Sequence, residues 1–519
     1  MEINSIPRLS KNFIKNKKQT ISAIPADNLL QLPEKVLQFG TGVLLRGLPD
    51  YFIDKANRKG IFNGRIVVVK STDSGDFDVF AKQDSLYTIC IRGVEDGNNI
   101  EENIVCSAIS RVLSAKNQWK EILACASNPE MQIVISNTTE IGIELVQDDI
   151  KQSPPVSYPG KLLAFLYERY KAFKGSTDKG MVIVPTELIV GNGEKLASIV
   201  LELAHRNGLE EGFIEWLENS NQFCNTLVDR ILPGLPDAAT KLKTEKLLGY
   251  KDELITFSEV YRLWAIEGDE HIKSVLSFMK ADAGVIVESN IDLYRELKLR
   301  LLNGTHTLSC GLAFLAGNTT VKEGMKNQDL FSFIKTLMLD EIAPNIPYEI
   351  KEQTIRDFGL STLERFQNPH IAHNWISITA QYTSKMRMRN IPILLHYYKT
   401  IKQVPEYFAF GFAGYLLFMK VVQKDGNNYK GENKGQLYPI NDNKAEYFYE
   451  KWKSLAPEAL VIEVLKDKSL WEHDLTRLPG FAPRVTECLK SMIENGVQNT
   501  LHSFLKKNHE RKSFKNTSQ

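Results

Sequence analysis

Short runs of β-branched and other apolar residues alternate with amphipathic stretches over the first half of the chain. Four of these runs, at residues 35–39, 65–71, 131–137 and 180–190, are long enough to be buried strands. Strands that alternate with helical patterns are typical of a mainly parallel sheet with helices on its faces. The first half is therefore expected to be an α/β domain.

Residues 85–108 of this domain contain two further β-rich arms. The arms flank Asp96 and Gly97, and an Asp-Gly pair between two strands favours a tight turn with positive φ at both positions. The pattern predicts a β-hairpin inserted into the α/β domain.

Beyond about residue 280 the strand patterns fade, and apolar residues recur at helical spacing. Helices are predicted at residues 293–317, 328–341, 349–365, 371–387, 391–401, 406–422, 443–466 and 484–506. Residues 424–443 are polar and rich in Gly and Asn, so they are expected to form an exposed loop. The second half thus predicts a mainly α-helical domain.

These patterns divide the chain into four parts. An N-terminal extension (1–34) precedes the α/β domain with its inserted hairpin (35–280), and the mainly helical domain (281–506) ends in a basic tail (507–519) that is expected to fray. Two domains agree with the length, because 519 residues are too many for a single hydrophobic core.

Composition excludes several classes of protein. The net charge of +1 gives no reason to expect a nucleic-acid or membrane-surface partner. The six cysteines are scattered without a CxxC pair, which argues against a zinc ribbon or a disulfide framework and suits a reducing cytoplasm. The longest uncharged run, residues 407–419, is too short to span a bilayer, and the polar N-terminus lacks the apolar core of a signal peptide. A soluble cytoplasmic protein is expected.

A glycine loop follows the first predicted strand. Gly40 allows a tight turn, Gly42 allows the backbone to approach a pyrophosphate, and Arg46 could add a phosphate contact. The third glycine of a GxGxxG fingerprint would fall at Leu45, so the fingerprint is incomplete, and a glycine turn without a ligand is the structural alternative. The loop favours a Rossmann-like dinucleotide-binding domain. The predicted cofactor-binding residues are Val36, Leu37, Gln38, Phe39, Gly40, Thr41, Gly42, Val43, Leu44, Leu45, Arg46 and Gly47.

Two further segments bear on the cofactor. The second strand ends in Lys70, Ser71 and Thr72 without the acid that would bind the ribose of NAD, so the residues leave NAD and NADP open. Thr139 and Glu140 follow a later strand, where they could contact the ribose and nicotinamide. Their alternative role is to cap a polar turn.

The segment KLRLLNGTH combines Lys298, Asn303 and His306 in a leucine-rich helical pattern. On an α-helix Lys298 and Asn303 lie about 140° apart, with His306 between them in angle and about 12 Å of axial rise from Lys298 to His306. A lysine base, an amide that donates to an alkoxide, and a histidine that holds a hydroxyl suit hydride transfer between an alcohol and a ketone. The alternative is a solvent-reaching lysine, a helix end at Asn-Gly and a buried core histidine.

The segments FGTGVLLRG, TTEIG, VPTELIVGNG, NTLVDRILP and KLRLLNGTH together resemble the polyol-specific long-chain dehydrogenases typified by mannitol 2-dehydrogenase. The order of the segments agrees, and the resemblance covers residues from about 35 to about 500. Within the family, LQFGTGVLLRGLPDYFIDKAN, GRIVVVKST and VPTELIVGNGEKL are most similar to the branch that reduces tagaturonate. The resemblance implies NAD-linked, metal-independent, reversible oxidation of D-altronate to D-tagaturonate in hexuronate breakdown, with NADP not excluded. It also implies a monomer or weak homo-oligomer.

The resemblance also implies roles for single residues. Lys298 would be the acid/base, Asn303 with Asn192 would form the oxyanion site, and His306 would bind substrate. Asp229 would lie in the same pocket with Arg230 bracing it, unless the two form a buried structural ion pair.

This chain departs from the polyol enzymes at NPHIAHNW, where Ala372 and His373 replace a substrate arginine and an acid of the family. A uronate carboxylate still needs a cation, so Lys385 or Arg387 is expected to bind it. His373 is interpreted as a substrate or packing residue. Fructuronate, a mannonate or a polyol remain alternative substrates. A catalytically silent dinucleotide-binding redox sensor is the alternative from another class.

Overall fold

The computed structural model describes residues 6–16, 22–71, 77–138, 142–371 and 373–516. By its own contacts the chain forms two compact units, which meet in the sequence at Ile291 and Asp292.

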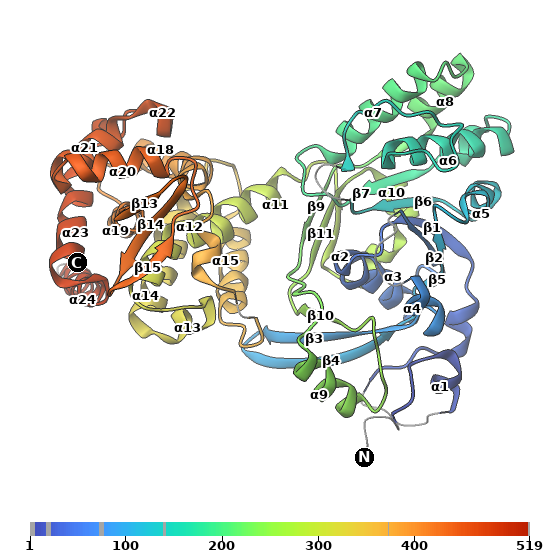
Figure 1. Cartoon of the computed structure of the whole chain (residues 1–519), viewed down its shortest axis with the longest axis horizontal. Coiled ribbons are helices and arrows are strands. Elements are labelled where there is room, and N and C mark those ends of the chain that lie inside the picture. Colours follow the sequence, from blue (N-terminus) through green and yellow to red (C-terminus); the bar gives the residue numbers. More distant parts are fainter. Residues whose placement is uncertain (1–5, 17–21, 72–76, 139–141, 372, 517–519) are drawn as a thin grey trace. The chain divides into compact units, whose positions relative to one another are not determined.

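The first unit is built on a six-stranded parallel sheet (Figure 1). Its order is β5-β2-β1-β6-β7-β8, in which the chain runs outward to one edge and then returns through the centre to the other. This is the order of a Rossmann sheet, whose ligand site lies at the reversal between β1 and β6. The strands are β1 (Glu34–Phe39), β2 (Arg65–Lys70), β5 (Ile109–Ser114), β6 (Ile133–Ser136), β7 (Val182–Pro185) and β8 (Gln222–Phe223). The four strands predicted from apolar runs are β1, β2, β6 and β7, and all are confirmed.

Helices bury both faces of this sheet. Alternate residues of β1 point to opposite sides, so that Val36 belongs to one apolar cluster and Leu37 to another. Residues of α2 (Val43–Gly47) and α3 (Pro49–Arg58) pack in the first cluster. Residues of α5 (Trp119–Ala124), α6 (Tyr158–Ala172), α7 (Asn192–Arg206) and α8 (Glu211–Ser220) pack in the second. Burial on both faces explains why these strands have no polar alternation.

The predicted hairpin is also confirmed. Strands β3 (Tyr87–Glu95) and β4 (Asn98–Cys106) pair antiparallel, and Asp96 and Gly97 both have positive φ, as a type I′ turn requires. Strand β10 (Thr256–Glu259) pairs with β3 and so extends the hairpin to three strands. Helix α4 (Phe77–Lys82) precedes β3 in the chain. Sequence patterns did not predict β10.

The sequence predicted a domain boundary at about residue 280. A third sheet places the end of the first unit later in the chain. Strand β12 (Val285–Glu288) pairs in parallel with β11 (Leu263–Glu267), which pairs antiparallel with β9 (Thr226–Asp229). These strands have only four or five residues, which is too short for a clear pattern. Between the strands lie α9 (Ala238–Leu248) and α10 (Glu270–Val275). The pairing of β12 holds residues up to about 290 in the first unit.

The second unit is mainly helical, as predicted. Its helices are α11 (Asp292–Leu297), α12 (Thr305–Leu315), α13 (Val321–Lys326), α14 (Gln328–Thr336), α15 (Glu352–Phe366), α16 (Trp375–Ile378), α17 (Tyr382–Lys385), α18 (Ile391–Thr400), α19 (Glu406–Phe418), α20 (Ala445–Ser454), α21 (Pro457–Lys466), α22 (Lys468–Trp471), α23 (Phe481–Asn495) and α24 (Val497–Asn516). The apolar helix α19, in which every residue from Tyr407 to Leu416 is buried, lies at the centre of the unit's core.

Two expectations for this unit are wrong. Residues 424–443 do not form a structureless loop, because β13 (Gln423–Asp425), β14 (Asn428–Asn433) and β15 (Gln436–Pro439) make a small antiparallel sheet there. These strands were not predicted because most of their side chains are exposed and polar, so the apolar pattern of a strand is absent. The tail does not fray at residue 507, since α24 continues to Asn516.

The N-terminal extension packs on the first unit. Helix α1 (Lys11–Asn16) buries Phe13 and Ile14 in a cluster with Tyr250 and Ile255. In the described part of the chain, no helix is long and apolar enough to cross a membrane.

Candidate active site

The segment that carries Lys298, Asn303 and His306 is not a regular α-helix. Helix α11 continues into a π-helical turn, η7 (Lys298–Gly304), and α12 begins at Thr305. Backbone hydrogen bonds of a π-helix join residues five apart, so Lys298 and Asn303 lie on adjacent turns of one face rather than about 140° apart. The wide turn brings together the two polar groups that a regular helix would separate.

A second π turn, η10 (Met386–Asn390), packs against the first. The side-chain amide of Asn390, which is fully buried, donates to the carbonyl of Gly304 at 3.0 Å. A Cβ atom at residue 304 would lie 3.2 Å from the Asn390 Nδ2, so the glycine permits this approach. Arg300, in the first π turn, also bonds to the second one. Its guanidinium donates to the carbonyls of Met388 and Arg389 at 2.7 and 2.9 Å.

Arg300 also forms an ion pair with Glu296 at 2.9 Å, which neutralises the arginine next to Lys298. Arg295 is likewise paired, with Asp292. Both arginines therefore serve the local structure of the turn.

His306 lies in an aromatic pocket. Its ring stacks on Phe366, with centroids 3.9 Å apart and planes 7° from parallel. His373 and Trp375 meet it edge-on at 5.6 and 5.9 Å. The structure thus brings two predicted substrate residues, His306 and His373, to one place, although 67 residues separate them in the sequence.

The predicted carboxylate-binding cations separate. The Lys385 Nζ donates to the carbonyl of Ile378 at 2.8 Å, and burial and then Arg389 lower its pKa. Burial and then Lys385 lower the pKa of His373, which favours the neutral form of the imidazole. Arg387 is 44% exposed and lies 3.6 Å from Glu472, in a hollow of about 500 Å³ that is also lined by His396 and His473. The structure therefore keeps Lys385 near His373 and places Arg387 in a separate, exposed hollow.

In the first unit, the glycine loop lies between β1 and α2, at the reversal of strand order. Gly40 has a φ of +124°, and a Cβ atom there would meet Leu45 Cδ1 at 2.8 Å and the Asn137 carbonyl oxygen at 3.1 Å. A Cβ atom at Gly42 would meet nothing within 4 Å. Space without a protein neighbour at this position is what a pyrophosphate against the backbone requires. The residues present therefore fit a dinucleotide.

The missing third glycine has a substitute two residues later. A Cβ atom at Gly47 would lie 2.1 Å from Leu232 Cδ2, so Gly47 provides the close packing. Leu45 is instead buried against Gly40. The helix after the loop is short, since α2 ends at Gly47 and the backbone turns at Leu48 before α3.

Arg46 holds the loop from inside. Its side chain is buried, donating to the Thr41 carbonyl at 2.7 Å and to the Thr256 hydroxyl at 3.3 Å. Burial lowers its pKa. These contacts show the arginine bracing the loop, whereas the sequence suggested a phosphate contact.

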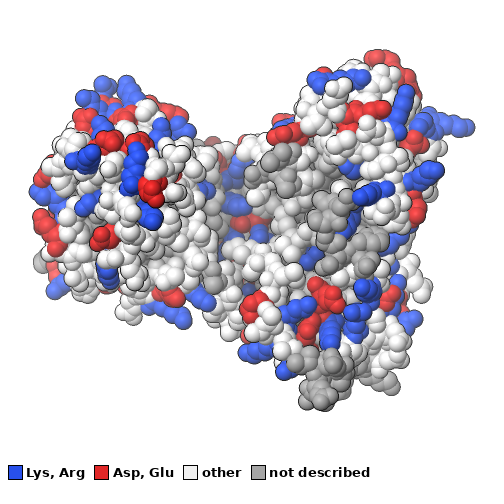
Figure 2. Space-filling view, viewed as in Figure 1, with Lys and Arg blue, Asp and Glu red and all other residues white. Residues whose placement is uncertain are grey.

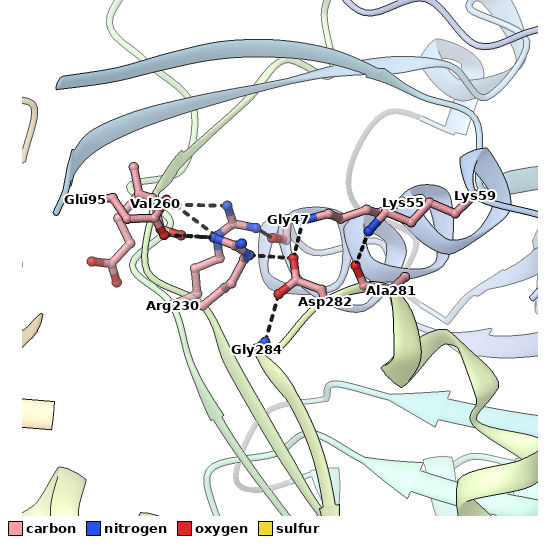
Figure 3. Close-up of polar contacts among 11 residues, drawn as sticks. Gly47, Lys55, Lys59, Glu95, Arg230, Val260, Ala281, Asp282 and Gly284 are labelled. Atoms are coloured by element: carbon pink, nitrogen blue, oxygen red, sulfur yellow. Dashed lines mark hydrogen bonds and ion pairs between the residues drawn. The ribbon is translucent and has the colours of Figure 1, made fainter. Parts of the chain in front are cut away.

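Arg230 braces the same loop from β9 (Figure 3). Its buried guanidinium donates to the Gly47 carbonyl at 2.6 Å and to the Glu259 carbonyl at 3.0 and 3.1 Å. The guanidinium also lies over the ring of Tyr51, 4.6 Å from its centroid. Arg230 is therefore a positioning residue of the first unit. Asp229, next to it, is buried at the end of β9 opposite Leu263.

We expect Arg230→Met to lower the free energy of unfolding by about 2–4 kcal/mol, because the Gly47 and Glu259 carbonyls lose their charged donor in a buried place. Urea unfolding measures the change. Arg206→Met, at an exposed arginine paired with Glu202, is the control and should stay within about 0.5 kcal/mol of the parent. Equal stability of the two variants would contradict the bracing role.

Asn192 is the first residue of α7. Its side chain is fully buried, and Nδ2 donates to the Pro185 and Glu187 carbonyls and to the Thr226 hydroxyl. Its Oδ1 accepts from the backbone N–H of Thr226 at 2.8 Å. These bonds tie β7 to β9, and the oxyanion role expected for Asn192 stays a prediction.

Thr139 and Glu140 lie outside the described residues, but the segment before them is held by a carboxylate that sequence patterns missed. Buried Glu187, after β7, accepts from the Thr138 backbone N–H at 2.8 Å and from the Ser136 hydroxyl at 3.2 Å. Burial raises its pKa. The sequence feature that could have identified Glu187 is its position two residues after the predicted strand β7.

A second buried carboxyl, Asp50 on α3, accepts from the Tyr87 hydroxyl at 3.1 Å. Burial raises its pKa from 3.8 to about 7. Because its pKa is higher in the folded chain, its contribution to stability is full below pH 3.8 and is lost as the pH rises through about 7.

We therefore expect the unfolding free energy of the Asp50→Asn variant to fall less than that of the parent between pH 4 and pH 7. Urea unfolding at a series of pH values measures the difference between the two proteins, which isolates Asp50 from other groups. Parallel curves would show that Asp50 ionises normally.

Acidic and basic side chains are interspersed over the face in view (Figure 2), in keeping with the net charge of +1. Among the described residues, no three His, Cys, Asp or Glu side chains gather as metal ligands do.

Comparison with known proteins agrees with this architecture. Residues 34–278 match the family model of the mannitol dehydrogenase Rossmann domain, and residues 290–493 match that of the mannitol dehydrogenase C-terminal domain. The chain is 37% identical over 484 residues to an altronate oxidoreductase of Bacillus subtilis, covering 92% of this chain and 96% of that protein. It is 36% identical over 485 residues to an altronate oxidoreductase of Halalkalibacterium halodurans, covering 92% and 94%.

Solved structures share the fold. Mannitol 2-dehydrogenase of Pseudomonas fluorescens, in a ternary complex with NAD and D-mannitol, is similar with a TM-score of 0.66 at 24% identity, covering 96% of this chain and 100% of that one. A substrate-free D-sorbitol dehydrogenase is similar with a TM-score of 0.75 at 19% identity, covering 95% and 100%. With both domain models matched in order, this chain belongs to the mannitol dehydrogenase family.

Proposed function

We propose that the chain catalyses the reversible, NAD-dependent reduction of D-tagaturonate to D-altronate in hexuronate catabolism. As a member of the mannitol dehydrogenase family it is an oxidoreductase that acts on CH–OH groups. The sugar-acid substrate is inferred from the relatives named altronate oxidoreductase, which are similar to it over nine-tenths of its length.

The observation that carries the chemistry is the π turn at Lys298–Gly304. In reduction, the Lys298 ammonium gives a proton to the substrate oxygen as the carbonyl becomes an alkoxide, and the Asn303 amide donates a hydrogen bond to the same oxygen. In oxidation Lys298 takes the proton back. His306, fixed on Phe366, binds a neighbouring substrate hydroxyl.

The remaining site residues are proposed by their place. His373 meets His306 edge-on. After burial, the charge of Lys385 is the second cause that lowers the pKa of His373. Both are assigned to the substrate. Residues Val36 to Gly47 other than Arg46, with Thr139 and Glu140, are assigned to the dinucleotide, which supplies the hydride when bound. Asp229 is assigned to the substrate pocket.

Substrate profiling tests the proposal. The purified protein is offered NADH or NADPH with D-tagaturonate, D-fructuronate or D-fructose in turn, and cofactor absorbance is followed. NADH consumption with D-tagaturonate is expected. Consumption only with D-fructuronate or D-fructose would move the assignment to another member of the family. Tight NADH binding with no consumption would instead support a redox sensor.

A further inference from the structure

The second π turn carries a cation, Arg389, that no proposed step has used. It lies one turn after Lys385, and burial and then the charge of Arg389 lower the pKa of Lys385. Burial lowers the pKa of Arg389 itself. Within the described part of the chain, neither side chain forms an ion pair with an acid. Their side chains instead donate to neutral oxygens, Arg389 to the Thr307 hydroxyl and Lys385 to the Ile378 carbonyl.

Two half-buried cations without a paired anion are unusual, because removal of a charge from water is costly unless an opposite charge compensates it. The carboxylate that Lys385 senses is that of Asp442, which already accepts from the backbone N–H groups of Thr383 and Lys444. The pair therefore has capacity for one further anion.

The free edge of Arg389 has the geometry of a carboxylate receptor. Nη1 donates to the Thr307 hydroxyl at 3.1 Å. Nε is buried, and among the described residues it has no hydrogen-bond partner. Nε and Nη2 present two parallel N–H groups, the fork that binds both oxygens of a carboxylate.

The receptor lies beside the catalytic turn. The Thr307 hydroxyl that accepts from Arg389 itself donates to the Asn303 carbonyl at 2.7 Å. Thr307 follows His306 directly, and Arg300 fixes the backbone of Arg389 through its carbonyl. An anion on Arg389 would therefore lie near the residues assigned to the substrate.

Arg387 provides an internal contrast on the same turn. It is two residues earlier, exposed, and close to Glu472. A surface arginine with a nearby acid has no comparable need for a ligand.

We propose that Arg389, with Lys385 beside it, receives the substrate carboxylate and so makes the enzyme selective for keto acids over neutral ketoses. The inference deepens the proposed function and rests on it. It assigns selectivity to a residue that the sequence pattern did not single out.

The test compares Arg389→Gln, Arg389→Lys and the matched control Arg387→Gln, each as the full chain with thermal unfolding as a check on folding. With D-tagaturonate, we expect Arg389→Gln to raise KM by about 30-fold or more, since loss of one partner of a buried charge pair costs about 2–5 kcal/mol. Its kcat should change much less. Arg389→Lys should restore part of the affinity, and Arg387→Gln should stay within about twofold of the parent.

D-Tagatose, which has a CH₂OH group in place of the carboxylate, separates charge recognition from general damage. Its kcat/KM should be the same in Arg389→Gln and the parent. Equal losses with D-tagaturonate and D-tagatose, or equal effects of the Arg389 and Arg387 variants, would overturn the proposal.

The parent enzyme keeps this test separate from that of the proposed function. If the parent prefers D-fructuronate, the assigned substrate is wrong, and the same variants are compared with that keto acid. If the parent uses neutral ketoses as well as D-tagaturonate, the selectivity proposal fails while the proposed function stands.

Discussion

Replacement of Lys298 by alanine is expected to lower the turnover of D-tagaturonate by about 10²–10⁴-fold, the usual contribution of a positioned acid or base. The alkoxide oxygen would then have no proton donor at the π turn, whereas NADH binding should be unchanged. In the oxidation direction, the loss should be partly relieved at high pH, because hydroxide can take the proton. Steady-state rates in both directions measure these effects.

Lys335→Ala is the matched control, since Lys335 is an exposed lysine on α14 of the same unit. It should retain the parent's turnover. A Lys298→Ala enzyme with the parent's turnover would remove the acid/base assignment, and a rate loss without any relief at high pH would assign Lys298 to substrate binding instead.

Gly42→Asp is expected to abolish most NADH binding while leaving the fold intact. The backbone at Gly42 has a φ of −64° and a ψ of 160°, which any residue can adopt, and a Cβ atom there meets no neighbour. The new carboxylate would stand where the pyrophosphate is expected. Repulsion between two charges about 4 Å apart is worth roughly 4 kcal/mol at an intermediate dielectric constant. Affinity should therefore fall by at least about 100-fold.

Fluorescence titration with NADH measures the affinity, and thermal unfolding shows that the variant folds. Gly97→Asp adds the same charge in open space at the tip of the β3–β4 hairpin, where positive φ is tolerated by aspartate. It should bind NADH as the parent does. If Gly42→Asp also binds NADH normally, the cofactor does not lie on this loop.

The parallel strands could be predicted from the sequence because burial on both faces produces continuous apolar runs such as residues 65–71. The hairpin could be predicted because the Asp-Gly turn has one dominant geometry. The short strands β9 to β12 could not, since four or five residues carry too little pattern. The strands β13 to β15 could not because their side chains are polar and exposed.

For the candidate site, the sequence indicated the residue types but not their geometry. An α-helical period separates Lys298 from Asn303, and the π turn that joins them is supported by contacts from Arg300 and Asn390 that involve distant residues. Tertiary bonding also decided the surroundings of Asn192, which bonds to β7 and β9, and of Arg230, which donates to the Gly47 carbonyl. Partners this distant in the sequence cannot be predicted from the spacing of residues along the chain.

The central claim, that this chain is a reductase of keto-uronates, is tested most directly by the kcat/KM values of the parent enzyme with NADH. D-Tagaturonate, D-fructuronate, D-tagatose and D-fructose are compared under one set of conditions. The account predicts the highest value for D-tagaturonate and much lower values for both neutral ketoses. A kcat/KM for D-fructose equal to or above that for either keto acid would contradict it.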